Sequence, residues 1–279
     1  MCKILHVLVC YYNEDEIFSF VREEIFGQSI TPEKILIVNN GTDNINKLLE
    51  LEKIYKGTVN VLNLKKNLGY LGAFSCALKK IDVFSFDFII LSNSDIHFLD
   101  NNFYKQLCNY KSIVLKNNIG IIAPDIFSKD FKYRLNPYMI NKPSINKLKF
   151  LKIIYSNFIF SIFYISLHYI SRFLAGQIKQ KRNTVIDNKI DFYAPHGSFF
   201  IFTKELTKKF DFQYGAFLFG EEIYIGEICK KLELKIRFVP ALKIIHKGHS
   251  TTGKWQTKKM FKYRRKSIDF LIKFLKNNI

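Results

Sequence analysis

The sequence predicts an α/β protein built on an open, mostly parallel sheet flanked by helices. Short apolar runs of strand length alternate with segments of helical length through the first ~120 residues, which is typical of successive βαβ units. The run at residues 4–10 is apolar at nearly every position, as expected for a strand buried on both faces of such a sheet. Polar clusters follow three of these runs, and ligands bind parallel sheets at the carboxyl ends of the strands.

The first half of the chain divides into four strands and three intervening helices. Turn-forming residues at 39–43 end the second strand, and Asn67 is placed to cap the third helix. The expected strands are residues 4–10, 34–38, 59–63 and 86–91, and the expected helices are 14–27, 44–56 and about 67–80.

Residues 129–190 interrupt this alternation with a helical insertion. The apolar run 153–171 contains no charged residue and approaches the length of a transmembrane helix, although serine, asparagine and histidine dilute it. If this run crossed a membrane, the two halves of one site would lie on opposite sides of the bilayer. Two interpretations follow, a helix lying on or shallowly in a membrane and an ordinary buried insertion.

Strand patterns return in the second half of the chain. A strand is expected at 190–202, a helix beginning at Glu221, a strand at 235–240 and a loop at 244–252. The end, about 258–278, has the pattern of a basic amphipathic helix, which suits either a membrane surface or a surface helix packed on the core.

Composition limits the class of protein and its partners. The 279 residues are 48% hydrophobic, enough for one sizeable core, and the formal net charge is +19. Nucleic acid, an anionic membrane surface or an acidic substrate would each suit that charge. The five scattered cysteines form neither a disulfide framework nor a zinc motif, so a reducing cytoplasm fits best, and the apolar start is too short for a secretory signal.

Asn93 and Asp95 end the fourth predicted strand. Because side chains alternate along a strand, these two point the same way, toward a ligand at the strand end. A divalent cation bound to a diphosphate needs only one or two protein oxygens. The alternative is a turn that merely ends the strand.

Three other groups of residues are candidates for a site. Gly69 and Gly72 allow a backbone to approach a ligand closely, and His246 with His249 is a candidate for a phosphate or metal contact, unless these histidines are structural. Glu221 and Glu222 begin a helix, where carboxylates are either catalytic or simple capping residues.

Taken in order, these segments resemble glycosyltransferase family 2, whose members have the nucleotide-sugar-binding GT-A fold. The likeness is closest to bacterial rhamnosyltransferase-like enzymes of surface polysaccharide assembly. It covers about 1–125 and 190–255, and it leaves 129–190 unexplained. Asn39 stands where the family usually has Asp, and Asn93 replaces the first Asp of the metal motif. The matching segments are 9–13, 37–42, 67–73, 91–96, 196–201, 219–223 and 245–248.

The resemblance implies an inverting hexosyl- or deoxyhexosyl-transferase. It implies one catalytic domain over 1–257, with a donor half at about 1–125 and an acceptor half at about 190–257, followed by a basic helix at 258–279. Glu222 would be the catalytic base, and Glu221 would cap the helix or orient a neighbour. Asp95 and His246 would hold Mg²⁺ or Mn²⁺. The residues implied to bind the nucleotide-diphospho-sugar are Tyr12, Asn13, Asn39, Asn40, Asn67, Gly69, Gly72 and Asn93.

The implied acceptor is a saccharide or lipid-linked saccharide of lipopolysaccharide, O-antigen or capsule. A cytoplasmic protein held peripherally on the inner face of the cytoplasmic membrane would reach it. A nucleic-acid-binding protein would also carry the charge, but the sequence has no recognisable nucleic-acid-binding motif. A sugar nucleotidyltransferase would show a glycine-rich, basic segment after the first strand, where residues 11–14 read Tyr-Tyr-Asn-Glu.

Overall fold

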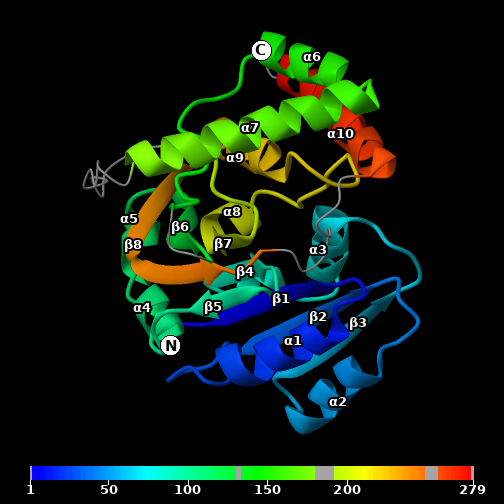
Figure 1. Cartoon of the computed structure of the whole chain (residues 1–279). Coiled ribbons are helices and arrows are strands. Elements are labelled where there is room, and N and C mark those ends of the chain that lie inside the picture. Colours follow the sequence, from blue (N-terminus) through cyan, green and yellow to red (C-terminus); the bar gives the residue numbers. More distant parts are fainter. Residues whose placement is uncertain (1, 130–132, 180–191, 249–256, 278–279) are drawn as a thin grey trace.

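The computed structural model describes residues 2–129, 133–179, 192–248 and 257–277. Within these ranges eight strands form one sheet in the order β3-β2-β1-β4-β7-β6-β8-β5, with helices on both faces (Figure 1). The strands are β1 Ile4–Cys10, β2 Lys34–Asn40, β3 Val59–Leu64, β4 Phe88–Ser92, β5 Ile96–Phe98, β6 Ile119–Ser128, β7 Phe199–Thr203 and β8 Lys235–His246. The helices of the first half are α1 Glu14–Ser19 with a π-helical continuation Phe20–Ile25, α2 Asn46–Ile54, α3 Tyr70–Leu78, a 3₁₀ turn Val83–Ser85, α4 Phe103–Cys108 and α5 Lys111–Lys116. The later helices are α6 Ile145–Ile154, α7 Phe158–Lys179, α8 Lys204–Thr207, α9 Glu221–Lys231 and α10 Lys258–Lys276.

The first four strands are mutually parallel, which confirms the prediction for the first half of the chain. β1 lies between β2 and β4, so the strand order reverses there, and the crevice beyond the carboxyl ends of β1 and β4 is where a ligand is expected. The sheet then becomes mixed, because β7 runs antiparallel between β4 and β6. Phe199, the first residue of β7, pairs with Ser92, the last of β4, so the turn before β7 lies at the same crevice.

The core has two layers, one on each face of the sheet. In β1, Leu5 and Val7 face the layer that contains α3, α8, α9 and α10, whereas Ile4 and Leu8 face the layer that contains α1, α2, α4 and α5. All four side chains are at most 1% exposed. Burial on both faces explains why β1 is a continuous apolar run in the sequence.

Two elements of the second half differ from the prediction. The strand expected at 190–202 begins only at Phe199; Ala194 forms an isolated bridge with Met139, Pro195 has no N–H to donate, and 190–191 lie outside the described residues. Residues 244–246, predicted as a loop, continue β8, because they pair with β5 on one side and β6 on the other. His249, the second histidine of the predicted pair, lies outside the described residues.

The insertion is formed by α6 and α7, so the apolar run is broken into two helices. The side chain of Asn157 accepts hydrogen bonds from the backbone N–H groups of Ile159 and Phe160, which starts α7 there. Ser161 is fully buried, but Ile153, Ile159 and Phe163 are each more than 60% exposed. Among the described residues no helix has the length and hydropathy needed to cross a bilayer.

The C-terminal helix confirms the predicted amphipathic pattern. Phe261, Leu271 and Leu275 of α10 are buried, and the ring of Phe261 stacks on Tyr155 just after α6. An ion pair joins Lys152 of α6 to Asp269 of α10. α10 therefore joins the insertion to the layer that contains α9.

Candidate active site

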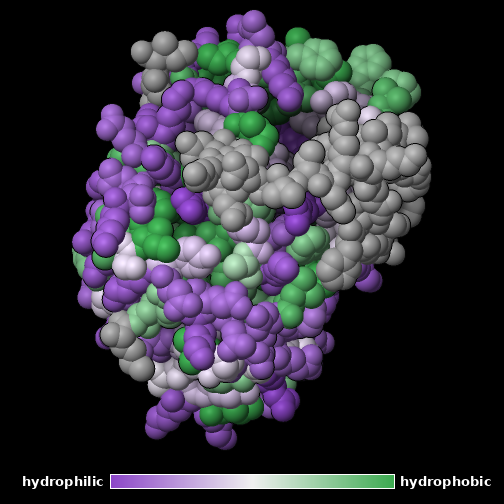
Figure 2. Space-filling view, turned by 90° about the vertical axis from the view of Figure 1, so that its left-hand side faces the viewer, coloured by the Kyte–Doolittle hydropathy of each residue, from purple (hydrophilic) through white to green (hydrophobic). Residues whose placement is uncertain are grey.

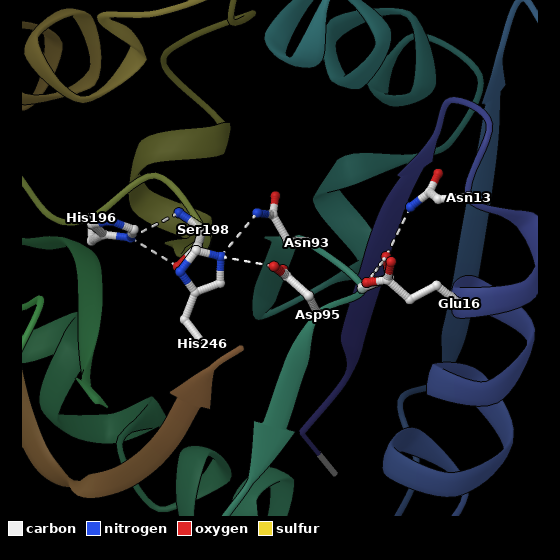
Figure 3. A network of polar contacts seen from close by, with 8 residues as sticks. Asn13, Glu16, Asn93, Asp95, His196, Ser198 and His246 are labelled. Carbon is white, nitrogen blue, oxygen red and sulfur yellow. Dashed lines mark hydrogen bonds and ion pairs between the residues drawn. The ribbon is translucent and has the colours of Figure 1, made fainter. Parts of the chain in front are cut away.

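The loop after β1 is tied to the end of β4 by Asn13. Its Oδ1 accepts a hydrogen bond from the N–H of Tyr11 at 2.8 Å, and its Nδ2 donates to the hydroxyl of Ser94 at 2.9 Å. Ser94 donates in turn to Glu16 of α1 at 3.0 Å (Figure 3). Tyr12 has a positive φ of 58° and is 72% exposed, so its ring is available to a ligand at the surface of the crevice.

Asp95 and His246 meet at the carboxyl end of β4. The Nε2 of His246 lies 3.2 Å from Oδ2 of Asp95 and 3.5 Å from Nδ2 of Asn93, as Figure 3 shows. Asp95 is 6% exposed, and its second oxygen, Oδ1, is buried without a hydrogen-bond partner among the described residues. Burial opposes the charged form, but the hydrogen bond and charge of His246 outweigh it and lower the pKa of Asp95.

His196 is a site residue to which the sequence analysis gave no role. It lies in the turn before β7, where its Nδ1 accepts hydrogen bonds from the hydroxyl of Ser198 at 2.8 Å and from the N–H of Ser198 at 3.2 Å. The ring centroids of His196 and His246 are 5.6 Å apart. Residues 196–201 are among the segments that carry the resemblance, but His196 itself received no role, because the direction of β7 that places it here cannot be read from the sequence.

The described residues contain no group of three or more His, Cys, Asp or Glu side chains that could hold a metal ion. The crevice instead offers the carboxylate of Asp95, with Oδ1 unbonded among the described residues, and the imidazole of His246 in contact with it. A hard divalent cation that shares its coordination with a diphosphate and water needs no more than this from the protein. These residues therefore fit such a cation.

An amide at the end of β2 and another after β3 fix the glycine loop before α3. Asn40 accepts from the N–H of Leu68 at 2.9 Å and donates to the side chain of Asn67 at 2.9 Å, and Asn67 accepts from the N–H of Gly69 at 2.8 Å. Asn39 is fully buried; its amide nitrogen donates to the carbonyl of Thr42 and to Asn63, both at 2.7 Å. The structure thus brings Asn40 and Asn67 to the loop that they hold, while Asn39 lies beneath the surface of the crevice.

Gly69 touches the loop that precedes the carboxylate pair. It has φ of +77°, and a Cβ there would lie only 1.8 Å from the carbonyl oxygen of Phe217. A side chain is therefore excluded by both conformation and contact. At Gly72 a Cβ would meet only the side chain of Leu68, at 3.2 Å, so the requirement for glycine is weaker there.

Glu221 and Glu222 begin α9, as predicted, after Gly220 in the left-handed region. Glu221 is 8% exposed and accepts the N–H of Phe219 at 2.9 Å, whereas Glu222 accepts the N–H of Gly197. Burial, followed by the charge of Glu222, raises the pKa of Glu221 to about 8, and burial also raises the pKa of Glu222.

Helix α10 supports the loop before these carboxylates, a role that the sequence analysis did not foresee. The hydroxyls of Tyr214 and of Ser267 in α10 both donate to the carbonyl of Phe219. The guanidinium of Arg264 lies 3.9 Å from the centre of the Phe219 ring, and its charge opposes the rise in the pKa of both glutamates. Helix α10 is thus part of the structure that supports the site.

No protein-family model and no curated protein sequence matches this chain. Several solved structures do match its fold. A mannosyltransferase from Pyrobaculum calidifontis in complex with GDP-Man and Mn²⁺ is 12% identical with a TM-score of 0.56, over 90% of this chain and 58% of that one. TarS of S. aureus, residues 1–349 in complex with UDP-GlcNAc, is 11% identical with a TM-score of 0.57, over 91% and 62%.

A third match is GalNAc-T7 with UDP, GalNAc and Mn²⁺, at 14% identity and a TM-score of 0.55, over 92% of this chain and 45% of that one. The chain therefore spans between 45% and 62% of the length of these three solved chains. At this level of identity the likeness establishes the architecture: the chain has the GT-A fold, with its mixed, open sheet and flanking helices.

Proposed function

We propose that this GT-A protein is a glycosyltransferase that moves a sugar from a nucleotide-diphospho-sugar to a hydroxyl of a saccharide or lipid-linked saccharide, with inversion. One observation carries the proposal: the turn before β7 lies next to both groups, because the N–H of Asn93, beside the Asp95–His246 pair, donates to the carbonyl of Ser198, and Gly197 lies against the carboxylate of Glu222. The resemblance to rhamnosyltransferase-like enzymes of surface polysaccharide assembly supports a hexosyl or deoxyhexosyl group.

Glu222 is the residue that we assign as the catalytic base. It takes the proton of the acceptor hydroxyl while that oxygen forms a bond to the anomeric carbon and the bond to the diphosphate oxygen breaks. A single displacement inverts the anomeric centre and needs no second nucleophile. A carboxylate with a raised pKa is a stronger base, and the backbone of Gly197 lies next to the carboxylate of Glu222.

Asp95 and His246 are the residues that would hold Mg²⁺ or Mn²⁺, with Asn93 beside them. The cation, when bound, supplies positive charge to the departing diphosphate. Asp95 suits this role because Oδ1 has no hydrogen-bond partner in the described part of the chain, while His246 contacts Oδ2.

The donor nucleotide would bind across the ends of β1, β2 and β3. Tyr12 offers an exposed ring to the base, and Asn13 braces the loop on which that ring is carried. Asn40 and Asn67 contribute chiefly by holding the backbone of the glycine loop, which approaches the donor at Gly69 and Gly72. Asn39 instead holds the turn after β2 through the carbonyl of Thr42.

The acceptor end of the crevice lies toward the three basic helices α6, α7 and α10. These carry thirteen lysines and arginines and one aspartate, a formal charge of +12 of the chain total of +19. Figure 2 shows hydrophobic side chains at the end of the molecule that these helices form, next to hydrophilic ones. This combination supports peripheral contact with an anionic membrane and a lipid-linked acceptor.

Thermal unfolding with a panel of nucleotide sugars, with and without Mn²⁺, tests the proposal. UDP-glucose, UDP-GlcNAc, GDP-mannose and dTDP-rhamnose are suitable probes, and transfer is then followed with the stabilising donor. A bound donor raises the unfolding temperature by mass action, and the rise should depend on Mn²⁺ and be lost in Asp95→Asn. Stabilisation by RNA and by none of the sugar nucleotides would favour a nucleic-acid-binding protein instead.

A further inference from the structure

The hydroxyl of Tyr70, the first residue of α3, has no role in the mechanism described above. It is buried and has no hydrogen-bond partner among the described residues. Other buried phenols are bonded: Tyr104 contacts the ring of His6 at 2.8 Å, and Tyr193 donates to Ile223 and Glu227. Because an unpaired buried hydroxyl is unfavourable, a ligand that completes its hydrogen bonding is expected at this position.

Tyr70 is placed at the junction of the donor and acceptor halves of the crevice. The residue before it, Gly69, lies against the backbone of Phe217 in the loop that leads to α9. Burial, followed by the charges of Glu221, Asp95 and Glu222, raises the pKa of Tyr70 well above its ordinary value. The phenol therefore stays protonated, and it can donate a hydrogen bond within reach of the charges of these three carboxylates.

We propose that the Tyr70 hydroxyl hydrogen-bonds an oxygen of the sugar ring of the donor, either a ring hydroxyl or an acetamido carbonyl. The inference rests on the proposed function. Asp95 marks the diphosphate end of the donor and Glu222 marks the side from which the acceptor attacks, so the transferred sugar lies between them. The surrounding carboxylates disfavour a further anion next to Tyr70, whereas a neutral sugar oxygen fits.

The test is isothermal titration of wild type and Tyr70→Phe with two ligands, each in Mn²⁺. One is the nucleotide sugar that stabilises the wild type most in the panel named above, and the other is the matching nucleoside diphosphate. Tyr70→Phe should weaken the binding of the nucleotide sugar by roughly three- to tenfold, which is the contribution of one hydrogen bond. The affinity for the nucleoside diphosphate should stay the same. The free variant should unfold at the same temperature or higher, because the deleted hydroxyl has no hydrogen-bond partner among the described residues.

Tyr193→Phe is the matched control. It deletes a phenol hydroxyl that is already hydrogen-bonded within the protein, so it should lower the unfolding temperature. It should not change the affinity for one of the two ligands more than the affinity for the other. Equal weakening of both ligands by Tyr70→Phe would move the contact to the diphosphate and overturn the assignment, and unchanged binding of both would overturn it as well. A wild type that binds no nucleotide sugar would be a different result, because it would overturn the proposed function itself.

Discussion

The backbone N–H of Gly197 donates a hydrogen bond to the carboxylate of Glu222. A Cβ at Gly197 would lie 2.7 Å from Oε1 of Glu222, so a side chain at residue 197 would displace this carboxylate from its position. Glu221, the adjacent carboxylate, instead accepts the N–H of Phe219 in its own loop. The two carboxylates therefore have different surroundings, and their roles can be separated by mutation.

Glu222→Gln should lower the rate of sugar transfer by about 10²–10⁴-fold, because an amide cannot take the proton of the acceptor hydroxyl. The amide oxygen can still accept the N–H of Gly197, so the fold and donor binding should be kept. Glu221→Gln is the matched control and should cost much less in rate. Single-turnover kinetics with saturating donor measures both. If Glu221→Gln is the inactive variant, the roles are reversed, and if neither variant slows transfer the base lies elsewhere.

The second prediction concerns the dependence of stability on pH. The pKa of Glu221 rises from an ordinary value of 4.5 to about 8 in the folded protein, because burial and Glu222 penalise its charged form. The unfolded chain therefore loses this proton first as the pH rises, and the contribution of Glu221 to the free energy of unfolding falls between about pH 4.5 and pH 8. Glu221→Gln has no ionisable group at this position, so this decrease in the free energy of unfolding should be absent from the variant.

Urea unfolding of wild type and Glu221→Gln at pH 5 and pH 8 measures this effect. The variant should gain stability relative to wild type at pH 8, while the two proteins should be similar at pH 5. The comparison cancels other groups that titrate in this range, such as the buried Asp125, because both proteins contain them. A stability difference that is the same at both pH values would contradict the prediction.

The parallel half of the sheet could be predicted because its strands are buried on both faces. Leu5 and Val7 face one layer of the core and Ile4 and Leu8 face the other, so the whole strand is apolar and stands out in the sequence. The position of Asp95 followed from the same reasoning, since a polar group directly after such a strand lies at its carboxyl end.

The direction of β7 could not be predicted, because parallel and antiparallel strands share the same alternation of side chains. That direction brings His196 to His246, so the role of His196 was missed. Arg264 was missed for a related reason. Its contact with Phe219 spans 45 residues and depends on how α10 packs, which no local pattern records.

The third prediction concerns the cation. Asp95→Asn should abolish the dependence of donor binding on Mn²⁺, because Oδ1 of Asp95 is the free carboxylate oxygen of the crevice. Asn93→Asp should strengthen metal binding, since a carboxylate is a better ligand than an amide for a hard cation. Titration of donor with and without Mn²⁺ measures both effects. Asp82→Asn, at an exposed cap of the 3₁₀ turn, is the control and should leave Mn²⁺ dependence unchanged. Equal donor binding by Asp95→Asn and wild type would show that this carboxylate holds no cation.

The last prediction concerns the exposed apolar surface of α6 and α7. Phe150 and Ile153 of α6 and Ile159, Phe160 and Phe163 of α7 are each between 54% and 73% exposed, which is unusual for so many large apolar side chains on two helices that contact each other. Apolar side chains beside this many lysines suit the interface of an anionic bilayer, where each nearby lysine adds about 1 kcal/mol of attraction at low salt.

The protein should sediment with vesicles that contain phosphatidylglycerol, and it should be released as salt is raised. The double variant Ile159→Ser with Phe163→Ser should lose most of this binding. Leu115 of α5, which is 55% exposed and lies in the opposite layer of the molecule, supplies the control, and Leu115→Ser should bind vesicles as the wild type does. Equal binding to phosphatidylcholine vesicles would show that charge is not the cause. If no vesicle is bound and analytical ultracentrifugation finds a dimer that the double variant disrupts, a second copy of the chain covers this surface, and the membrane assignment is wrong.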